Sequence, residues 1–309
     1  MTISIMLSLL SIVVSFEHIS TFHFPNGLVY RGEIFKSEDY PYVMFLKFWN
    51  SPKSYSGCTG TLVKKMFVLT AAHCCHERTE SDVQVYQGSP LVSNPDIHKV
   101  VKIFKHKDYD PVKNKLGVRG DICVLKVSGK PFKHIKKFMK IGGSPNDFKN
   151  GKKLNCKMFG FGGTGDNRTK GQSGYMMTND VVYGEKACEL HQSEEIHASW
   201  TQYLCLVPNG YSTTCQGDSG GPMICNEVQY GVCSFGYPFS GKPGGCGVPD
   251  QQEIYAFIYV YKEWLYSIIG PNKDKKKKKK RSSGNLLKSH CTLHIILLIL
   301  LNNIMSNFI

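Results

Sequence analysis

The sequence predicts an all-β protein, a barrel or a sandwich, between about residues 29 and 269. Short runs rich in Val, Ile, Phe and Tyr recur through this region, and clusters of Gly, Pro, Asn and Asp interrupt them at intervals of about ten residues. Strands are expected at four clear runs: 42–48, 61–69, 122–127 and 228–235. Residues 259–268 instead carry apolar residues at helical spacing and end at Gly270-Pro271, which predicts a terminal helix.

Size and cysteine content are typical of a globular protein from an oxidising compartment. The chain has 309 residues, 41% of them hydrophobic, so most of it can bury a core and is not disordered. Twelve cysteines exceed what an ordinary cytosolic enzyme carries. The net charge is +14, of which +8 comes from residues 271–309. Basic residues confined to a tail do not indicate a nucleic-acid-binding face, so no nucleic-acid partner is expected.

Both ends of the chain differ in composition from the region between them. Residues 1–15 form an apolar run too short to span a bilayer, which predicts a secretory signal peptide ending by about residue 20. Residues 16–28 would then be a short propeptide. Residues 271–309 are Lys-rich, then small and polar, then apolar. This order is typical of a glycolipid-anchor signal attached at Ser282, Ser283 or Gly284, with a tail-anchoring helix or a disordered extension as alternatives.

Three short motifs contain the residue types that nucleophilic catalysis needs. Residues 214–222 read TCQGDSGGP, where the glycines allow close approach of a substrate and the N–H groups of Gly217 and Ser219 can meet at one developing oxyanion. His73 lies in TAAHC after a strand-like run, and Asp121 precedes another in GDICVLK. Because a serine hydroxyl is a poor nucleophile, Ser219 would need His73 as general base, and His73 would need Asp121 to hold its tautomer.

In this order, His then Asp then Ser, the motifs resemble those of the trypsin/chymotrypsin-like serine endopeptidases. Further marks of the resemblance are Gly160-Phe161-Gly162, Ser234-Phe235-Gly236, and Ile254-Tyr255 leading to Trp264. The resemblance implies two six-stranded antiparallel β-barrels with a C-terminal helix over residues 29–270. It also implies that His73, Asp121 and Ser219 cleave peptide bonds through an acyl-enzyme, with Gly217 and Ser219 forming the oxyanion hole and with no metal or cofactor.

The resemblance implies four disulfides: Cys58–Cys74, Cys156–Cys225, Cys188–Cys205 and Cys215–Cys246. The first would close a loop around the histidine strand, and the fourth would tie the serine loop to the wall of the specificity pocket. Four further cysteines lie outside this scheme: Cys75, Cys123, Cys233 and Cys291. An extra bridge involving Cys75, Cys123 or Cys233 and buried free thiols are both open. The run 73–76, HCCH, lacks the spacing of a structural zinc site, so no metal is expected there.

The sequence departs from the family pattern at the activation site. In the family a new amino terminus, usually Ile-Val-Gly-Gly after a basic residue, inserts and pairs with the aspartate before the nucleophile, here Asp218. Counting back from Pro41-Tyr42 assigns that role to Val29. Because Leu28 precedes Val29, a trypsin-like activator would not cut there, and activation would need another protease.

A second departure lies in the specificity pocket. Trypsins carry an aspartate six residues before the nucleophile, where this chain has Thr213, and Glu253 replaces the usual pocket glycine before Ile254. Glu253 either supplies the missing negative charge or fills the pocket, so a mixed or unusual preference is expected for the substrate residue before the cleaved bond. Nine residues separate Gly236 from Cys246, which favours a reshaped pocket entrance. The expected substrate-binding residues are Thr213, Thr214, Ser234, Gly236 and Glu253.

The sequence therefore predicts a secreted serine endopeptidase that acts on protein or peptide substrates. An activating protease and protein inhibitors are the further candidate partners, and a membrane is a partner only if residues 271–309 anchor the protein at a surface. The alternative is a non-catalytic homologue that acts as a binding or regulatory protein. The unusual activation site and pocket favour that alternative, and the complete set of His73, Asp121 and Ser219 opposes it.

Overall fold

The computed structural model describes residues 32–89, 95–113, 119–129, 132, 135, 138–163, 174–188, 194–210, 212–238, 246, 248 and 251–271. The predicted signal peptide and propeptide, Val29, Cys291 and the candidate anchor signal lie outside the described residues. Among the described residues, no helix is long and apolar enough to cross a membrane.

The first barrel is built from the first half of the chain. Its closed strand order is β2-β3-β4-β7-β6-β5, and every pair is antiparallel. The predicted strand over 61–69 is in fact a hairpin, because the chain turns at Lys65-Met66 between β3 and β4. The six strands are β2 (Val43–Ser51), β3 (Ser54–Lys64), β4 (Phe67–Thr70), β5 (Val83–Gln87), β6 (Asp96–Lys105) and β7 (Cys123–Val127).

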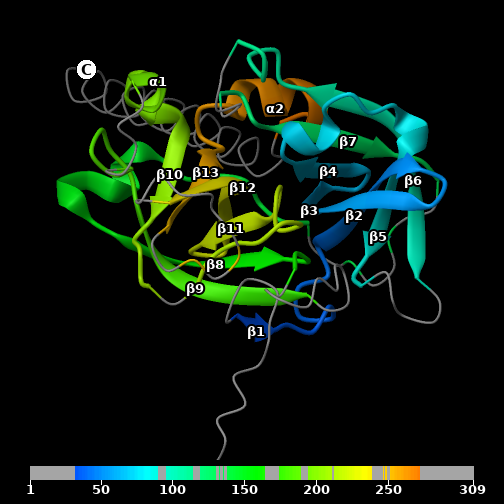
Figure 1. The fold of residues 1–309 in the computed structure, drawn as a ribbon, viewed down its shortest axis with the longest axis horizontal. Coiled ribbons are helices and arrows are strands. Elements are labelled where there is room, and N and C mark those ends of the chain that lie inside the picture. Colours follow the sequence, from blue (N-terminus) through cyan, green and yellow to red (C-terminus); the bar gives the residue numbers. More distant parts are fainter. Residues whose placement is uncertain are drawn as a thin grey trace, which may run out of the picture.

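The second barrel follows in sequence and lies beside the first, in green and yellow in Figure 1. Its order is β9-β10-β13-β12-β11-β8, and it closes because β9 pairs with β8 as well as β10. The short strand β1 (Glu33–Ile34) pairs with β9 outside this ring. The six strands are β8 (Leu154–Gly160), β9 (Tyr175–Val182), β10 (Tyr203–Leu206), β11 (Pro222–Cys225), β12 (Val228–Pro238) and β13 (Gln251–Phe257).

Strand β2 explains how the two barrels are joined. Met44, Leu46 and Phe48 on one face belong to the first core, whereas Val43 and Phe45 on the other face join a separate cluster with residues of the second barrel. In that cluster the rings of Phe45 and Phe161 lie 5.9 Å apart, close to edge-on. A strand buried on both faces reads as a continuous apolar run, as 43–46 does.

In the part of the chain that the structure describes, helices are few and short. The terminal helix α2 (Lys262–Ile269) packs Leu265 and Ile269 into the core of the first barrel, and Gly270, with φ +74°, follows its last residue. The remaining helices are α1 (Glu194–Ala198) and the 3₁₀ segments η1 (His73–Cys75), η2 (Glu80–Asp82), η3 (Pro145–Gly151) and η4 (Trp200–Gln202). Two six-stranded antiparallel barrels with a C-terminal helix are the fold predicted from the sequence, and the prediction is confirmed.

Candidate active site

His73 and Asp121 meet because the strands that precede and follow them are paired. Thr70, the last residue of β4, is paired with Cys123, the first residue of β7. His73 follows β4 by three residues and Asp121 precedes β7 by two. The Nδ1 atom of His73 lies 2.8 Å from Oδ2 of Asp121, and the backbone N–H of His73 donates to Oδ1 at 2.8 Å. These two contacts fix the ring orientation and favour the tautomer that carries its proton on Nδ1.

Asp121 is buried and receives a third hydrogen bond. The Ser234 hydroxyl, on β12 of the second barrel, donates to Oδ2 of Asp121. Only 1% of the Asp121 surface is exposed. Together the three hydrogen bonds hold the carboxylate in one position between the two barrels. Ser234 was expected among the substrate-binding residues, and the structure directs its side chain to the acid.

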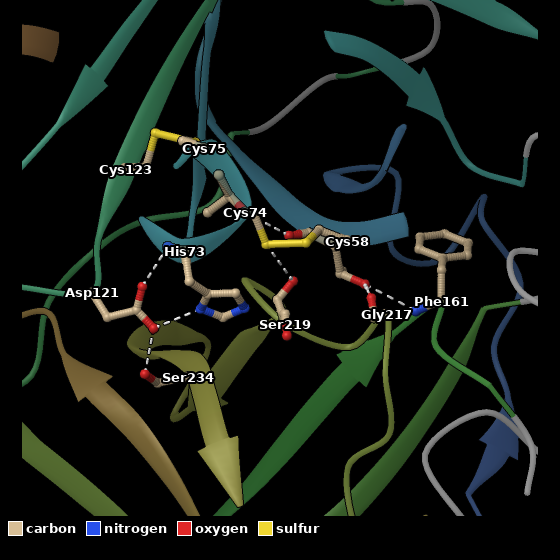
Figure 2. Close-up of a disulfide and its surroundings, with 12 residues drawn as sticks. Cys58, His73, Cys74, Cys75, Asp121, Cys123, Phe161, Gly217, Ser219 and Ser234 are labelled. Carbon is tan, nitrogen blue, oxygen red and sulfur yellow. Dashed lines mark hydrogen bonds and ion pairs between the residues drawn. A yellow bond between two sulfur atoms is a disulfide. The ribbon is translucent and has the colours of Figure 1, made fainter. Parts of the chain in front are cut away.

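The environment of His73 shifts its protonation equilibrium. Burial lowers the pKa of His73, but the charge of Asp121 and the hydrogen bond to it raise the pKa, and the net pKa lies above the ordinary value of 6.5. The ring remains about one-third exposed, so its outer nitrogen can reach a substrate or a nucleophile. Figure 2 shows the imidazole lying between the Asp121 carboxylate and Ser219.

The loop that carries Ser219 is held from the first barrel by Thr59 on β3. The backbone N–H of Thr59 donates to the Ser219 carbonyl at 2.8 Å, and its hydroxyl donates to the Gly217 carbonyl at 2.8 Å. The same hydroxyl accepts the N–H of Phe161 at 3.0 Å (Figure 2). Gly217 has φ +108°, a conformation that favours glycine. One buried threonine therefore orients the peptide whose N–H groups are the candidate oxyanion donors.

Asp218 lies in a tight backbone pocket beside this loop. Its Oδ1 accepts the N–H of Gly162 at 2.8 Å, its Oδ2 accepts the N–H of Cys215 at 2.7 Å, and the residue is 1% exposed. A Cβ atom at Gly162 would lie 2.7 Å from Oδ1, and one at Gly160 would overlap the same oxygen. Glycine is needed at both positions because the carboxylate approaches the backbone closely. Val29, its expected partner, is outside the described residues.

The structure brings three of the expected pocket residues together. Glu253 is 2% exposed and accepts the N–H of Thr214 at 3.2 Å, and it also accepts the Thr214 hydroxyl. A Cβ atom at Gly236 would lie 2.8 Å from Oε2 of Glu253, so the carboxyl group lies against the backbone of β12 and does not face solvent. Burial raises the pKa of Glu253, and its hydrogen bonds lower it by less. Thr213 is also buried.

Gln251 is a partner of Glu253 that the sequence analysis did not identify. Its Nε2 donates to Oε1 of Glu253 at 2.5 Å, and it lies two positions earlier on β13. Residues two apart on a strand lie on the same face, so the position of Gln251 relative to Glu253 is enough to predict that the two side chains are neighbours.

The structure joins the four cysteine pairs implied by the resemblance: Cys58–Cys74, Cys156–Cys225, Cys188–Cys205 and Cys215–Cys246. A fifth disulfide joins Cys75 to Cys123. Within the described residues Cys233 is a buried free thiol, and burial raises its pKa. Cys58, His73 and Cys74 have potential metal-ligand atoms within 4.8 Å of one another, but the disulfide between the two cysteines leaves no thiolate to bind an ion.

Comparison with known proteins identifies the class. The family model described as "Trypsin" matches residues 29–265, and the chain therefore belongs to the trypsin family of serine endopeptidases. It is 26% identical over 219 residues to serine protease 1 of Rattus norvegicus, covering 71% of this chain and 82% of the relative. It is 29% identical over 275 residues to the thrombin-like enzyme cerastocytin of Cerastes cerastes, covering 87% and 96%.

A third relative is a venom plasminogen activator of Trimeresurus albolabris, GPV-PA. It is 30% identical over 221 residues, covering 70% of this chain and 79% of the relative. The family membership confirms the prediction of a trypsin-like serine endopeptidase and implies that its substrates are proteins.

Proposed function

We propose that this protein is a secreted serine endopeptidase whose catalytic domain is residues 29–270 and whose nucleophile is Ser219. The observation that carries the proposal is the His73–Asp121 pair, joined at 2.8 Å through Nδ1 and lying beside Ser219. The five disulfides among the described residues indicate an oxidising compartment, which supports secretion. Surface attachment through residues 271–309 stays a prediction.

In the proposed reaction, the Ser219 hydroxyl attacks the carbonyl carbon of the scissile peptide bond and its proton passes to Nε2 of His73. The negative charge that develops on the carbonyl oxygen accepts hydrogen bonds from the N–H groups of Gly217 and Ser219. His73 then gives the proton to the leaving amine, and water hydrolyses the acyl-enzyme by the same route. Asp121 supports both steps because its charge stabilises the imidazolium, in agreement with the raised pKa of His73.

Activation is proposed to follow cleavage between Leu28 and Val29. The new α-ammonium group of Val29 would pair with Asp218, whose carboxylate is already buried in the pocket formed by Gly160 and Gly162. An α-ammonium group beside this buried carboxylate would stabilise one loop conformation and so orient the Gly217 N–H.

Titration with a serine-reactive phosphonate tests both the nucleophile and the activation. Protein that begins at Val29 is expected to bind one equivalent at Ser219, located by peptide mass mapping. Protein that retains residues 16–28 is expected to react at least tenfold more slowly, since removal of one oriented oxyanion donor alone costs about a hundredfold or more. Equal reaction of the two forms would refute the role of Val29. No reaction of either would favour the non-catalytic binding protein.

The specificity proposal rests on the position of Glu253. Its carboxylate enters from the pocket wall and is already bonded to Thr214 and Gln251, so it would pair with a substrate lysine or arginine less directly than an acid on the pocket floor. Thr213, at the position where trypsins carry an aspartate, has no charge. Mixed selectivity follows, in which basic and aromatic residues before the scissile bond are both accepted.

Two substitutions separate the charge of Glu253 from its volume. Glu253→Gln removes the charge and keeps the size, and it is expected to lower kcat/KM for Lys and Arg substrates at least tenfold, about 1.4 kcal/mol, with little effect on Phe substrates. Glu253→Gly should cause the same loss and also improve Phe and Leu substrates, because it enlarges the pocket. The measurement is kcat/KM over a peptide series that varies only this residue.

The pH dependence gives a further check within the same series. Because burial raises the pKa of Glu253, the carboxyl group is neutral in acid, and the ratio of Lys to Phe cleavage should rise as the pH increases through that pKa. Because protonation of His73 affects the cleavage of both substrates equally, it does not change this ratio. Strong Lys and Arg cleavage that survives both substitutions would show that the pocket has been assigned wrongly.

A further inference from the structure

The Cys75–Cys123 disulfide has no part in the reaction proposed above, yet it lies beside two of the groups that carry it. Cys75 follows His73 by two residues, and Cys123 follows Asp121 by two. Their Cα atoms are 6.8 Å apart, and both side chains are buried. Figure 2 shows the bond running from the turn that bears His73 to the strand that follows Asp121.

The disulfide makes a second connection between the same two parts of the chain. Upstream of His73, Thr70 is already paired with Cys123 through the β4–β7 ladder. Downstream, Cys75 bonds covalently to that same Cys123. The residues on both sides of His73, Thr70 and Cys75, are therefore attached to the same residue of β7, Cys123. Cys74, which lies between His73 and Cys75 in the sequence, points away from β7 and bonds to Cys58 on β3 (Figure 2).

The turn that carries His73 has few hydrogen bonds of its own, although Cys74 also ties it to β3 and Ala72 and Cys75 are buried in the first core. It is a single 3₁₀ turn of three residues, held by a Cys75 N–H to Ala72 carbonyl bond of 3.0 Å and a longer His76 N–H to His73 carbonyl bond of 3.4 Å. The two His73–Asp121 hydrogen bonds require this turn and the start of β7 to keep one relative position. A misplacement of about 1 Å can cost a large factor in rate.

We propose that Cys75 and Cys123 are positioning residues for catalysis, and that their disulfide holds the His73 turn against the Asp121 strand at the distance that the His73–Asp121 hydrogen bonds require. The inference rests on the proposed function, because it assigns the pair a role in that reaction. Cross-linking by itself stabilises a fold wherever it occurs. A positioning role differs because it predicts an effect on His73 that a remote disulfide does not have.

The test removes the bond as a pair, in Cys75→Ala/Cys123→Ala, and compares it with Cys188→Ala/Cys205→Ala, which removes a disulfide of the second barrel. Each is measured for kcat, KM, the pH profile of kcat/KM and Tm, in protein that begins at Val29. The first variant is expected to lose about tenfold in kcat with KM changed less than twofold. The control is expected to lower Tm without that change.

The pH profile is the decisive readout. Asp121 supplies the charge and the hydrogen bond that raise the pKa of His73, so loosening their contact should move the acid limb of kcat/KM to lower pH. The control should leave the limb at its wild-type position. If the first variant keeps the wild-type kcat and acid limb while its Tm falls, the disulfide is only structural and the inference is wrong.

A third variant is needed in case the double alanine variant does not fold. It also separates the effect of the covalent bond from the effect of core packing. Cys75→Ala/Cys123→Met refills most of the volume of the two sulfur atoms without a cross-link. It should show the same lower kcat and shifted acid limb, whereas wild-type behaviour would overturn the inference. A wild-type protein that cleaves no peptide would instead overturn the proposed function, so the two failures are distinguishable.

Discussion

Replacement of Ser219 by alanine is expected to abolish phosphonate labelling and to lower kcat by about 10⁵- to 10⁶-fold, because the chain then has no nucleophile at the position that His73 serves. In free energy this is about 7 to 8 kcal/mol of lost transition-state stabilisation. The oxyanion donors of Gly217 and Ser219 come from the backbone and remain in the variant, so some residual rate above that of water is expected.

His73→Ala should lower kcat nearly as much as Ser219→Ala does. The double variant should lower kcat no further, since the two side chains act as a unit. Ser54→Ala, at an exposed serine in the β2–β3 hairpin, is the matched control and should retain full activity. The comparison uses active-site-titrated protein and a peptide library covering many residues before the scissile bond. Wild-type protein that begins at Val29 and cleaves nothing in that library would remove the basis for the enzymatic assignment.

Gly160→Ala is expected to lower kcat by about 10²- to 10³-fold, although Gly160 touches no substrate. A methyl group at this position would overlap Oδ1 of Asp218, and β8 cannot move aside easily because Gly160 is paired with Tyr175 in the sheet. Asp218 must move instead. Its neighbours in sequence, Gly217 and Ser219, provide the two oxyanion N–H groups, so both lose their common orientation.

Gly163→Ala is the matched control for that variant. It lies three residues further along the chain, and the atom nearest to its added methyl group would be the Gln216 carbonyl oxygen, at 3.9 Å. It should retain kcat within about twofold. Far-UV circular dichroism and Tm establish that both variants fold. A folded Gly160→Ala variant with wild-type kcat would show that the position of Asp218 does not control the oxyanion donors.

The barrels could be predicted because their signal is local and repeated. Apolar runs and turn clusters mark strands without knowledge of their partners, and the motifs around His73, Asp121 and Ser219 are contiguous in sequence. Boundaries were less accurate: the expected strand over 61–69 is two strands, since two residues at 65 and 66 are enough to reverse the chain. The terminal helix begins at Lys262, because residues 259–261 form a turn first.

Contacts that depend on pairing between strands could not be predicted in the same way. The sequence alone does not identify the partner of Cys75, because this pairing depends on the register of β4 against β7, which places Cys123 opposite Thr70. The Ser234 hydroxyl reaches Asp121 from the other barrel, across 113 residues of sequence. The position of Glu253 against Gly236 likewise depends on the β12–β13 register, where these two residues are partners.

The hydrogen bonds of Thr59 have a consequence for how the molecule acquires its activity. Ser219 belongs by sequence to the second half of the chain, but its loop is bonded to a strand of the first half through the N–H and the hydroxyl of this one residue. Neither half contains the full set of contacts that shapes the loop. The shape of the catalytic loop therefore depends on the docking of the two halves, and we expect catalytic competence to arise only once both barrels have folded and docked.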